Sequence, residues 1–357
     1  YLDAMEDIMG EDSGSGNGMP AGLLPGLGGG NVPTEVMVSQ NPHILTIGSG
    51  AWAAPVEYNN IPILSNLYTG GIVGYCERGS RLVIVNCMNS GNLRSLADAP
   101  GGVSLKAYLA SREVGADTGE LGEGDFEISV SGGIIGANLE NQVIDRCVNT
   151  GTMNGFIGLG GIVGINAGGV FNCLLADNFG NMGLDYIGGI AGLNIHGGAL
   201  PGMQEAGTRT FHYTDAGGKA WTYVSGTIAC CGTREKKNIS GRSYVGGIAG
   251  YNMAGAVLQS NTNHADVTGA GDYVGGIAGA NGGIIWVSHS EGGRAYAVTG
   301  NNGQGIGGIV GWNRREGSID VMVPPESPGG EVVAVNTDVS VTGREKVGGI
   351  MGITQGV

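Results

Sequence analysis

Charged residues are scarce in this sequence. Asp, Glu, Lys and Arg make up 13% of the 357 residues, about half of the usual share. The 17 basic residues stand against 31 acidic ones, for a net charge of −14, and this acidic balance argues against nucleic-acid binding. Six cysteines are too few for a disulfide scaffold. No apolar run reaches the roughly 18 residues of a membrane span, and the 41% apolar content argues against a disordered chain.

Glycine is abundant, with 74 residues, about three times average usage. It does not recur at every third position, which excludes collagen. Instead the block Gly-Gly-Ile-x-Gly occurs eight times, at 70–74, 132–136, 160–164, 188–192, 246–250, 275–279, 307–311 and 348–352. Most blocks begin about 29 residues after the one before, but two of the intervals are about twice as long. Gly101-Gly102-Val103 and Gly217-Gly218-Lys219 stand at the midpoints of these two long intervals. If these count as degenerate copies, the repeat recurs about every 29 residues.

Each repeat contains about three short apolar runs, rich in β-branched residues and bounded by Gly, Asn or Ser. These runs are too short for helices and favour β-strands. One repeat cannot bury its own apolar face, but stacked copies can. The pattern therefore predicts an all-β, right-handed parallel β-solenoid of about ten coils, with Ile248 and Ile277 pointing to the same face. At the usual strand spacing such a rod is about 45 Å long.

An asparagine follows the block by two residues in six copies. These are Asn138, Asn166, Asn194, Asn252, Asn281 and Asn313. Side-chain amides in that register can bond to one another from coil to coil. We therefore predict an inward asparagine ladder beside a glycine corner.

The segment Tyr244-Val245-Gly246-Gly247-Ile248-Ala249-Gly250-Tyr251-Asn252, continuing to Val267-Thr268-Gly269, resembles the GLUG repeat. That repeat is found in large secreted and surface-anchored bacterial proteins, including adhesin-like proteins and the non-catalytic parts of immunoglobulin A1-specific zinc metallopeptidases. The resemblance covers about residues 68–357. It implies a stalk or display surface rather than a particular activity.

The pattern divides the chain into three parts. Residues 1–40 are an acidic, glycine-rich head or linker, and residues 41–69 are a cap or first coil. Residues 70–357 form the repeat region, with irregular segments near 92–131 and 195–243. Within the first of these, residues 103–114 suit a projecting helix or a degenerate coil. The last block stands close to Val357, so we expect the end of the rod and the head to be covered by more chain or by a neighbouring copy.

Residues 208–224 alternate in polarity around a glycine turn and predict a β-hairpin. The hairpin carries Phe211, Tyr213, Trp221 and Tyr223. Two interpretations stay open: exposed rings that bind a partner, or rings that pack against the rod.

Motifs of catalysis are not found in the sequence. The five histidines form no H-E-x-x-H, there is no G-x-S-x-G, and Asp145, Asp266, Asp272 and Asp320 stand singly. We therefore predict no catalytic residues, no cofactor and no metal site. Cys87, Cys147 and Cys173 occupy one place in the repeat, which Ser260 and Ser288 fill later, whereas Cys230-Cys231 lies in an insertion. A position shared by Cys and Ser predicts packed thiols, with Cys147 stacked on Cys173.

These features predict a non-enzymatic, extracellular structural or adhesive β-solenoid of a bacterial surface or secreted protein. Its expected partners are a host or neighbouring-cell surface, through protein or glycan, or copies of itself, with neither nucleic acid nor membrane insertion. Two alternatives stay open: the stalk of a secreted protease or glycan-active enzyme, and a subunit of an extracellular filament.

Overall fold

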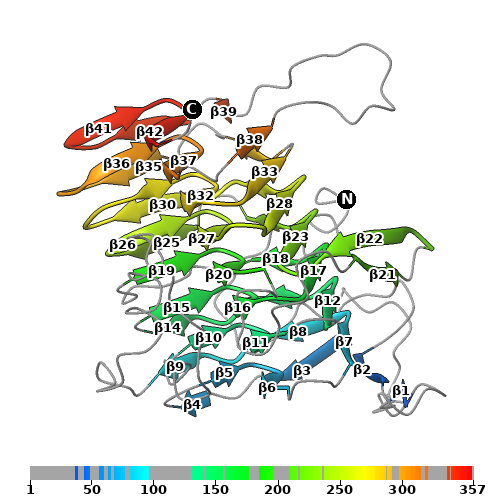
Figure 1. Cartoon of the computed structure of the whole chain (residues 1–357). Helices are drawn as coiled ribbons and strands as arrows, with labels where there is room; N and C mark the ends of the chain where they lie inside the picture. Colours follow the sequence, from blue (N-terminus) through cyan, green and yellow to red (C-terminus); the bar gives the residue numbers. More distant parts are fainter. Residues whose placement is uncertain are drawn as a thin grey trace, which may run out of the picture.

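The described part of the chain is built from β-strands alone. The computed structural model describes residues 37–38, 44–48, 56–59, 63–65, 68–76, 81–95, 130–139, 142–155, 157–176, 185–196, 210–215, 218–234, 237–286, 288–291, 297–314, 318–320, 336–337 and 339–355. All regular elements among these residues are strands. They form mainly parallel sheets, in which strands from successive repeats lie one above another (Figure 1).

Two long sheets, A and B, follow one another along the chain. Sheet A has the order β1 (Met37–Val38), β2 (Ile44–Gly48), β7 (Arg81–Val85), β12 (Val143–Asp145), β17 (Gly169–Phe171), β23 (Thr227–Ala229), β28 (Val257–Gln259), β33 (Ile284–Trp286) and β38 (Ser318–Asp320). Sheet B has the order β3 (Val56–Asn59), β8 (Cys87–Asn89), β13 (Val148–Asn149), β18 (Leu174–Leu175), β24 (Gly232–Thr233), β29 (Thr262–Asn263), β34 (His289–Glu291) and β39 (Asn336–Thr337).

Two further sheets, D and E, flank the Gly-Gly turns. Sheet D contains β5 (Tyr68–Gly70), β10 (Val130–Gly132), β15 (Ile157–Gly160), β19 (Asp185–Gly188), β26 (Ser243–Gly246), β31 (Val274–Gly275), β36 (Gln304–Gly307) and β41 (Glu345–Gly348). Sheet E contains β6 (Val73–Tyr75), β11 (Ile135–Asn138), β16 (Val163–Asn166), β20 (Ala191–Asn194), β27 (Ala249–Asn252), β32 (Ala278–Asn281), β37 (Val310–Asn313) and β42 (Met351–Thr354).

Three small sheets complete the described strands. Sheet C holds β4 (Ile63–Ser65), β9 (Leu93–Ser95) and β14 (Met153–Asn154), and sheet F holds β25 (Asn238–Gly241), β30 (Asp266–Gly269), β35 (Ala297–Gly300) and β40 (Ser340–Thr342). The hairpin, sheet G, consists of β21 (Thr210–Thr214) and β22 (Ala220–Val224). Only the β1–β2 and β21–β22 pairs are antiparallel among the described pairings.

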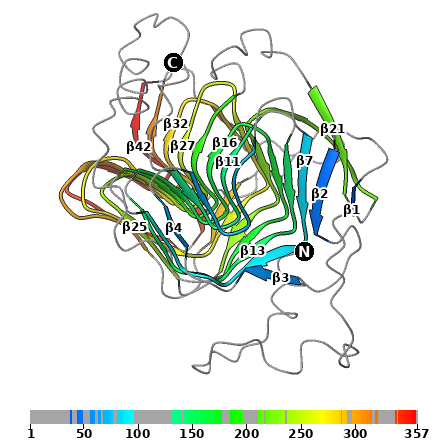
Figure 2. The ribbon, with the colours of Figure 1, turned by 90° about the horizontal axis from the view of Figure 1, so that it is seen from below.

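The chain visits the sheets in a fixed order. For example, β26, β27, β28, β29 and β30 belong to sheets D, E, A, B and F, and β31 then returns to sheet D beside β26. Seen along the stack in Figure 2, the strands of one sheet overlie one another. β2 supplies a strand of sheet A, and β3, β4 and β5 supply the first strands of sheets B, C and D.

Glycine lets sheets D and E approach backbone to backbone. A Cβ atom on Gly246 would lie 2.0 Å from the carbonyl oxygen of Ala249. We call the strands that one repeat contributes to the stack a rung. A Cβ on Gly250 would lie 2.5 Å from the backbone nitrogen of Ile187 in the preceding rung. No real Cβ fits at such distances, so the recurrence of glycine follows from this close approach.

The isoleucine of each block points into one shared core. Ile248 and Ile277 are fully buried in the same apolar cluster, and the Ile248 amide donates to the Ile277 carbonyl at 2.9 Å. The cluster also contains Ile134, Ile162, Ile190 and Ile309. The prediction that these residues share one column is confirmed.

No described strand of sheets D and E comes from the two degenerate copies, and this corrects the count of ten coils. β5 pairs directly with β10, joining Gly70 to Gly132, and β19 pairs directly with β26, joining Gly188 to Gly246. Each of these sheets therefore has eight strands among the described residues. Gly218 instead occupies the hairpin turn, at φ 80°, where no atom approaches its Cβ position. The Gly101 copy and the alternatives for residues 103–114 fall outside the described residues, as does the head, residues 1–40, apart from Met37 and Val38.

Candidate functional site

The six predicted asparagines lie on one line at the end of the strands of sheet E. The Asn138 side chain donates to Asn166 at 2.7 Å. The ladder continues through Asn194, Asn252, Asn281 and Asn313, with Nδ2–Oδ1 distances of 2.8 to 2.9 Å. All six side chains are buried. Asn194 also donates to the Gly226 carbonyl at 2.8 Å, so the ladder satisfies backbone groups where the chain leaves sheet E.

Asn252 provides a direct test of the ladder. Its replacement by leucine breaks the amide bonds to Asn194 and Asn281 and leaves buried polar groups without partners. We expect Asn252→Leu to lower the free energy of unfolding by about 1–3 kcal/mol, measured by urea denaturation. Asn302→Leu, at an exposed turn, is the control and should change it by less than about 0.5 kcal/mol. Equal effects of the two variants would refute the ladder's contribution.

A second, shorter set of polar side chains was missed by the sequence analysis. It follows sheet B, where Asn89 donates to Asn149 at 2.8 Å and Thr233 donates to Asn263 at 2.6 Å. Leu175 pairs with Asn149 in this register and interrupts the series. The signal was present in the spacing, because Asn89 and Asn149 each stand two residues after a buried cysteine.

The cysteines form a buried column at the start of sheet B. The Cys147 amide lies 3.4 Å from Cys173 Sγ, and the Cys173 amide lies 3.4 Å from Cys231 Sγ. Cys87, Cys147, Cys173 and Cys231 are all fully buried free thiols. Each lies within hydrogen-bonding range of the carbonyl two residues before it, as Cys173 does with Phe171 at 3.1 Å. The stacking predicted for Cys147 and Cys173 as packed thiols is thus present.

Two assignments in this column need correction. Cys231 is a member of the column rather than part of an insertion. The position above it belongs to Asn261, whose Oδ1 accepts from the Cys231 amide at 3.0 Å. Ser260 instead precedes the column by one residue, at the corner where the chain passes from sheet A to sheet B. Its φ is 52°, and Arg146 has the same φ at the equivalent corner of an earlier repeat. The sequence comparison was one residue out of register there because this corner accepts several residue types.

Thiol labelling distinguishes the column from the other cysteines. Only Cys76 and Cys230 are partly exposed. Hydrogen bonding to Cys147 and burial raise the pKa of the Cys87 thiol, and burial raises the pKa of both Cys173 and Cys230. Against the effect of burial, hydrogen bonds from the neighbouring cysteines lower the pKa of Cys147, so burial rather than pKa separates the column from Cys76 and Cys230. We expect iodoacetamide to modify Cys76 and Cys230 in the folded protein and all six cysteines after unfolding without reductant, as read by mass spectrometry. Protection of column thiols after unfolding would instead reveal disulfides.

The predicted hairpin is present and packs its rings on the outer face of sheet A. Phe171 of β17 stands at the centre, with ring-centroid distances of 5.7, 4.9 and 5.2 Å to Tyr213, Trp221 and Tyr223. These three rings are buried, and Phe211 is partly buried. The structure therefore favours the packed interpretation for Tyr213, Trp221 and Tyr223. They do not form an exposed binding face as the partner-binding hypothesis requires.

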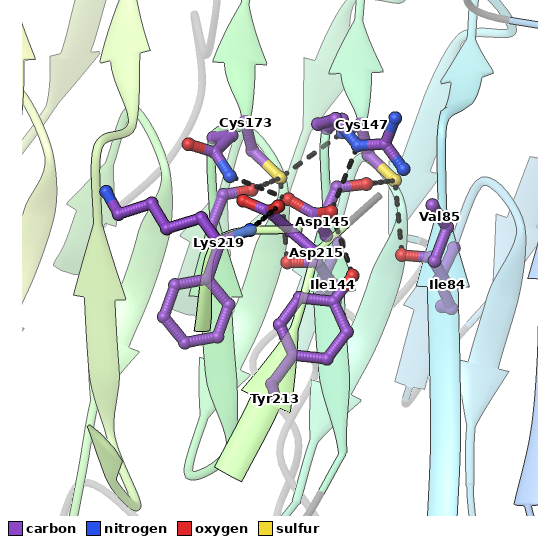
Figure 3. Close-up of polar contacts among 12 residues, drawn as sticks. Ile84, Val85, Ile144, Asp145, Cys147, Cys173, Tyr213, Asp215 and Lys219 are labelled. Atoms are coloured by element: carbon purple, nitrogen blue, oxygen red, sulfur yellow. Dashed lines mark hydrogen bonds and ion pairs between the residues drawn. The ribbon is translucent and has the colours of Figure 1, made fainter. Parts of the chain in front are cut away.

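A buried carboxylate fixes the hairpin to the sheet, as Figure 3 shows. Asp145 of β12 accepts from the Tyr213 hydroxyl at 2.8 Å, from Arg146 Nε at 3.0 Å and from Asn172 Nδ2 at 2.8 Å. Asp145 and Arg146 are almost fully buried. Burial raises the pKa of the Asp145 carboxyl, while these three donors oppose the rise. Burial, followed by the adjacent Asp145 carboxylate, raises the pKa of Tyr213.

A second carboxylate orders the hairpin turn. Asp215 accepts from the Lys219 amide at 2.9 Å and from Trp221 Nε1 at 3.1 Å. The Lys219 ammonium lies 3.6 Å from the centre of the Trp221 ring, a cation–π contact. The hairpin is thereby fixed at its turn and along its inner face. Its outer face presents Thr210, His212, Thr214 and Thr222 to solvent.

An aromatic stack runs beside sheets D and E and was also missed from the sequence. The ring centroids of Tyr186 and Tyr244 lie 4.6 Å apart, those of Tyr244 and Tyr273 lie 5.0 Å apart, and Trp312 follows Tyr273 at 4.8 Å. The three tyrosines adopt φ between 56° and 64°, rare for large side chains. The recurring Tyr before an apolar residue and Gly-Gly was the available signal. Because the rings stack on one another, their faces are largely covered.

Across the described ranges, no cluster of three or more His, Cys, Asp or Glu side chains is placed to hold a metal ion. The described residues likewise include no helix with the length and apolarity to cross a membrane.

Comparisons with protein-family models, curated proteins and solved structures find no match for this chain.

Proposed function

We propose that this chain is a right-handed parallel β-solenoid that works as a non-catalytic, extracellular structural and adhesive rod of a bacterial surface or secreted protein. The observation that carries the proposal is the asparagine ladder, which joins six successive rungs of sheet E by five buried amide bonds. In a stacked-repeat architecture each rung is stabilised by its neighbours. Such repeated bonds suit a rigid spacer. The resemblance to GLUG repeats leads to the same function.

The adhesive part of the proposal rests on the hairpin. Its inner face is held by Asp145 and the rings around Phe171, so its outer face is presented from a fixed base. That face carries hydroxyls and an imidazole, with His212 Nδ1 3.2 Å from Thr222 Oγ1. Hydrogen-bonding groups of this kind suit a polar partner, such as a glycan or a protein on a host or neighbouring cell. The outer face thus replaces the aromatic rings as the proposed contact surface.

The rod and the adhesive surface are tested separately. Negative-stain microscopy of the purified chain should show rods of uniform width; compact spheres would overturn the structural role. Glycan arrays and binding to whole cells should detect a ligand, and His212→Glu with Thr222→Glu should abolish that binding. Thr268→Glu, on the distant sheet F, is the control and should retain it. Trp221 fluorescence reports whether the hairpin stays folded. Absence of binding on both platforms, or full binding by the double variant, would refute the adhesive role of this face.

A further inference from the structure

The Asn-Gly dipeptide is the sequence most prone to spontaneous backbone rearrangement, because glycine puts no side chain in the way of its own attacking nitrogen. Four such dipeptides occur, beginning at Asn17, Asn154, Asn281 and Asn302. The first lies outside the described residues. The other three share the same chemistry but stand in different surroundings, so the fold decides which of them can react.

Asn302 stands in the turn between β35 and β36 and is exposed, and Gly303 is partly exposed. Within the described part of the chain, no hydrogen bond restrains the Asn302 side chain or the Gly303 amide. The side-chain carbonyl carbon of Asn302 and the backbone nitrogen of Gly303 are therefore not held by hydrogen bonds, while the Cα of Gly303 packs on the preceding repeat, where a Cβ would lie 2.0 Å from the Gly271 carbonyl oxygen.

Asn281 has the opposite surroundings. Its side chain is fully buried in the ladder, accepting from Asn252 and donating to Asn313. The amide of Gly282, the would-be nucleophile, already donates to the Asn252 carbonyl at 2.7 Å. Asn154 is intermediate, because it is half-buried and its backbone pairs in β14 with Arg94 of β9.

We propose that Asn302-Gly303 is a site of spontaneous covalent modification that converts Asn302 to isoaspartate and aspartate. The Gly303 nitrogen loses its proton and attacks Asn302 Cγ. The Cγ–Nδ2 bond breaks and ammonia leaves, giving a five-membered succinimide. Water then opens the ring at either carbonyl, giving aspartate or a backbone lengthened through the side chain. The only co-reactant is water, and no electrons are transferred.

The position of this turn gives the reaction a structural consequence. On one side the Asn301 amide donates to the Gly269 carbonyl at 2.9 Å. On the other the Gln304 amide donates to Asp272 Oδ1 at 2.9 Å. Both bonds connect the turn to the preceding rung. An isoaspartate adds a backbone atom between them and a new negative charge to an already acidic chain, so we expect the modified turn to lose these two bonds.

The experiment follows the whole chain during incubation at mildly alkaline pH, with peptide mapping by electron-transfer mass spectrometry to separate isoaspartate from aspartate. Asn302 should convert at least about ten-fold faster than Asn281, the factor given by about 1.4 kcal/mol of local opening free energy. The urea-unfolded chain should convert both at similar rates. Hydrogen exchange at Asn301 and Gln304 should increase with the modified fraction.

Asn302→Gln is the matched variant, because the longer side chain keeps the amide but disfavours the five-membered ring. It should remove conversion at this turn and keep slow exchange at Asn301 and Gln304. The proposal is overturned if Asn302 stays intact in the folded chain while it converts in urea. It is also overturned if Asn281 converts as fast as Asn302 in the folded chain. It is equally overturned if the faster exchange of the aged protein also develops in Asn302→Gln.

Discussion

Gly247→Ala is expected to destabilise the protein by at least about 3 kcal/mol, at or beyond the upper end of ordinary over-packing. A Cβ at this position would lie 2.1 Å from the Gly276 carbonyl oxygen and 2.3 Å from Asn263 Cγ. The first contact is with backbone of the next rung, which is held by its own ladder of hydrogen bonds. Relief would require several rungs to move together. Urea denaturation followed by circular dichroism measures the loss.

The last rung supplies a matched control for this substitution. Gly349 is the second glycine of its block, as Gly247 is, but nothing lies within 4 Å of its Cβ position. We expect Gly349→Ala to change the free energy of unfolding by no more than about 0.5 kcal/mol. If the two variants are equally stable, the close approach of the rungs is not what requires glycine. If both are strongly destabilised, the requirement comes from local backbone conformation instead.

The repeat-based features were predictable because they recur with constant residue types. The glycine block identified the column of Ile248 and Ile277, and the asparagine two residues later identified the ladder. The same reasoning failed where only part of the pattern was present. At 217–219 two glycines stand without the isoleucine and the final glycine. Gly218 serves a hairpin turn, where its φ is positive, rather than close packing between sheets.

The hairpin's docking site could not be derived in the same way, because its contacts join distant parts of the chain. Tyr213 meets Asp145 across 68 residues, and no periodicity connects the two. The sequence showed the alternating rings but not which surface they cover. The sheet A position that holds Val85 in β7 holds Asp145 in β12 and Phe171 in β17. The same position holds Trp286 in β33 and Asp320 in β38, so a carboxylate or a large ring at this position does not by itself identify the covered surface.

Asp145→Val should cost about 3–5 kcal/mol, because it leaves the buried Arg146 guanidinium without its carboxylate. It also removes the acceptors for Tyr213 and Asn172. The chain already contains a corner without this ion pair, because Val85 and Asn86 stand after β7 at the positions equivalent to Asp145 and Arg146. The double variant Asp145→Val with Arg146→Asn copies that corner, and we expect it to recover most of the loss. Failure to recover would mean that the hairpin bond to Tyr213, rather than the unpaired guanidinium, dominates the cost.

The pH dependence of the free energy of unfolding gives a second, independent test of how Asp145 affects stability. Burial raises the pKa of Asp145 in the folded protein above its unfolded value, so folding favours the protonated form. This contribution to stability is fully present below the unfolded pKa and is lost as the pH rises through the folded pKa. The stability of the wild type relative to the double variant should therefore improve as the pH falls from neutrality towards the ordinary range of aspartate. Paired urea titrations across that interval measure the slope. A difference that shrinks on acidification would mean that the three donors outweigh burial and hold the carboxylate ionised.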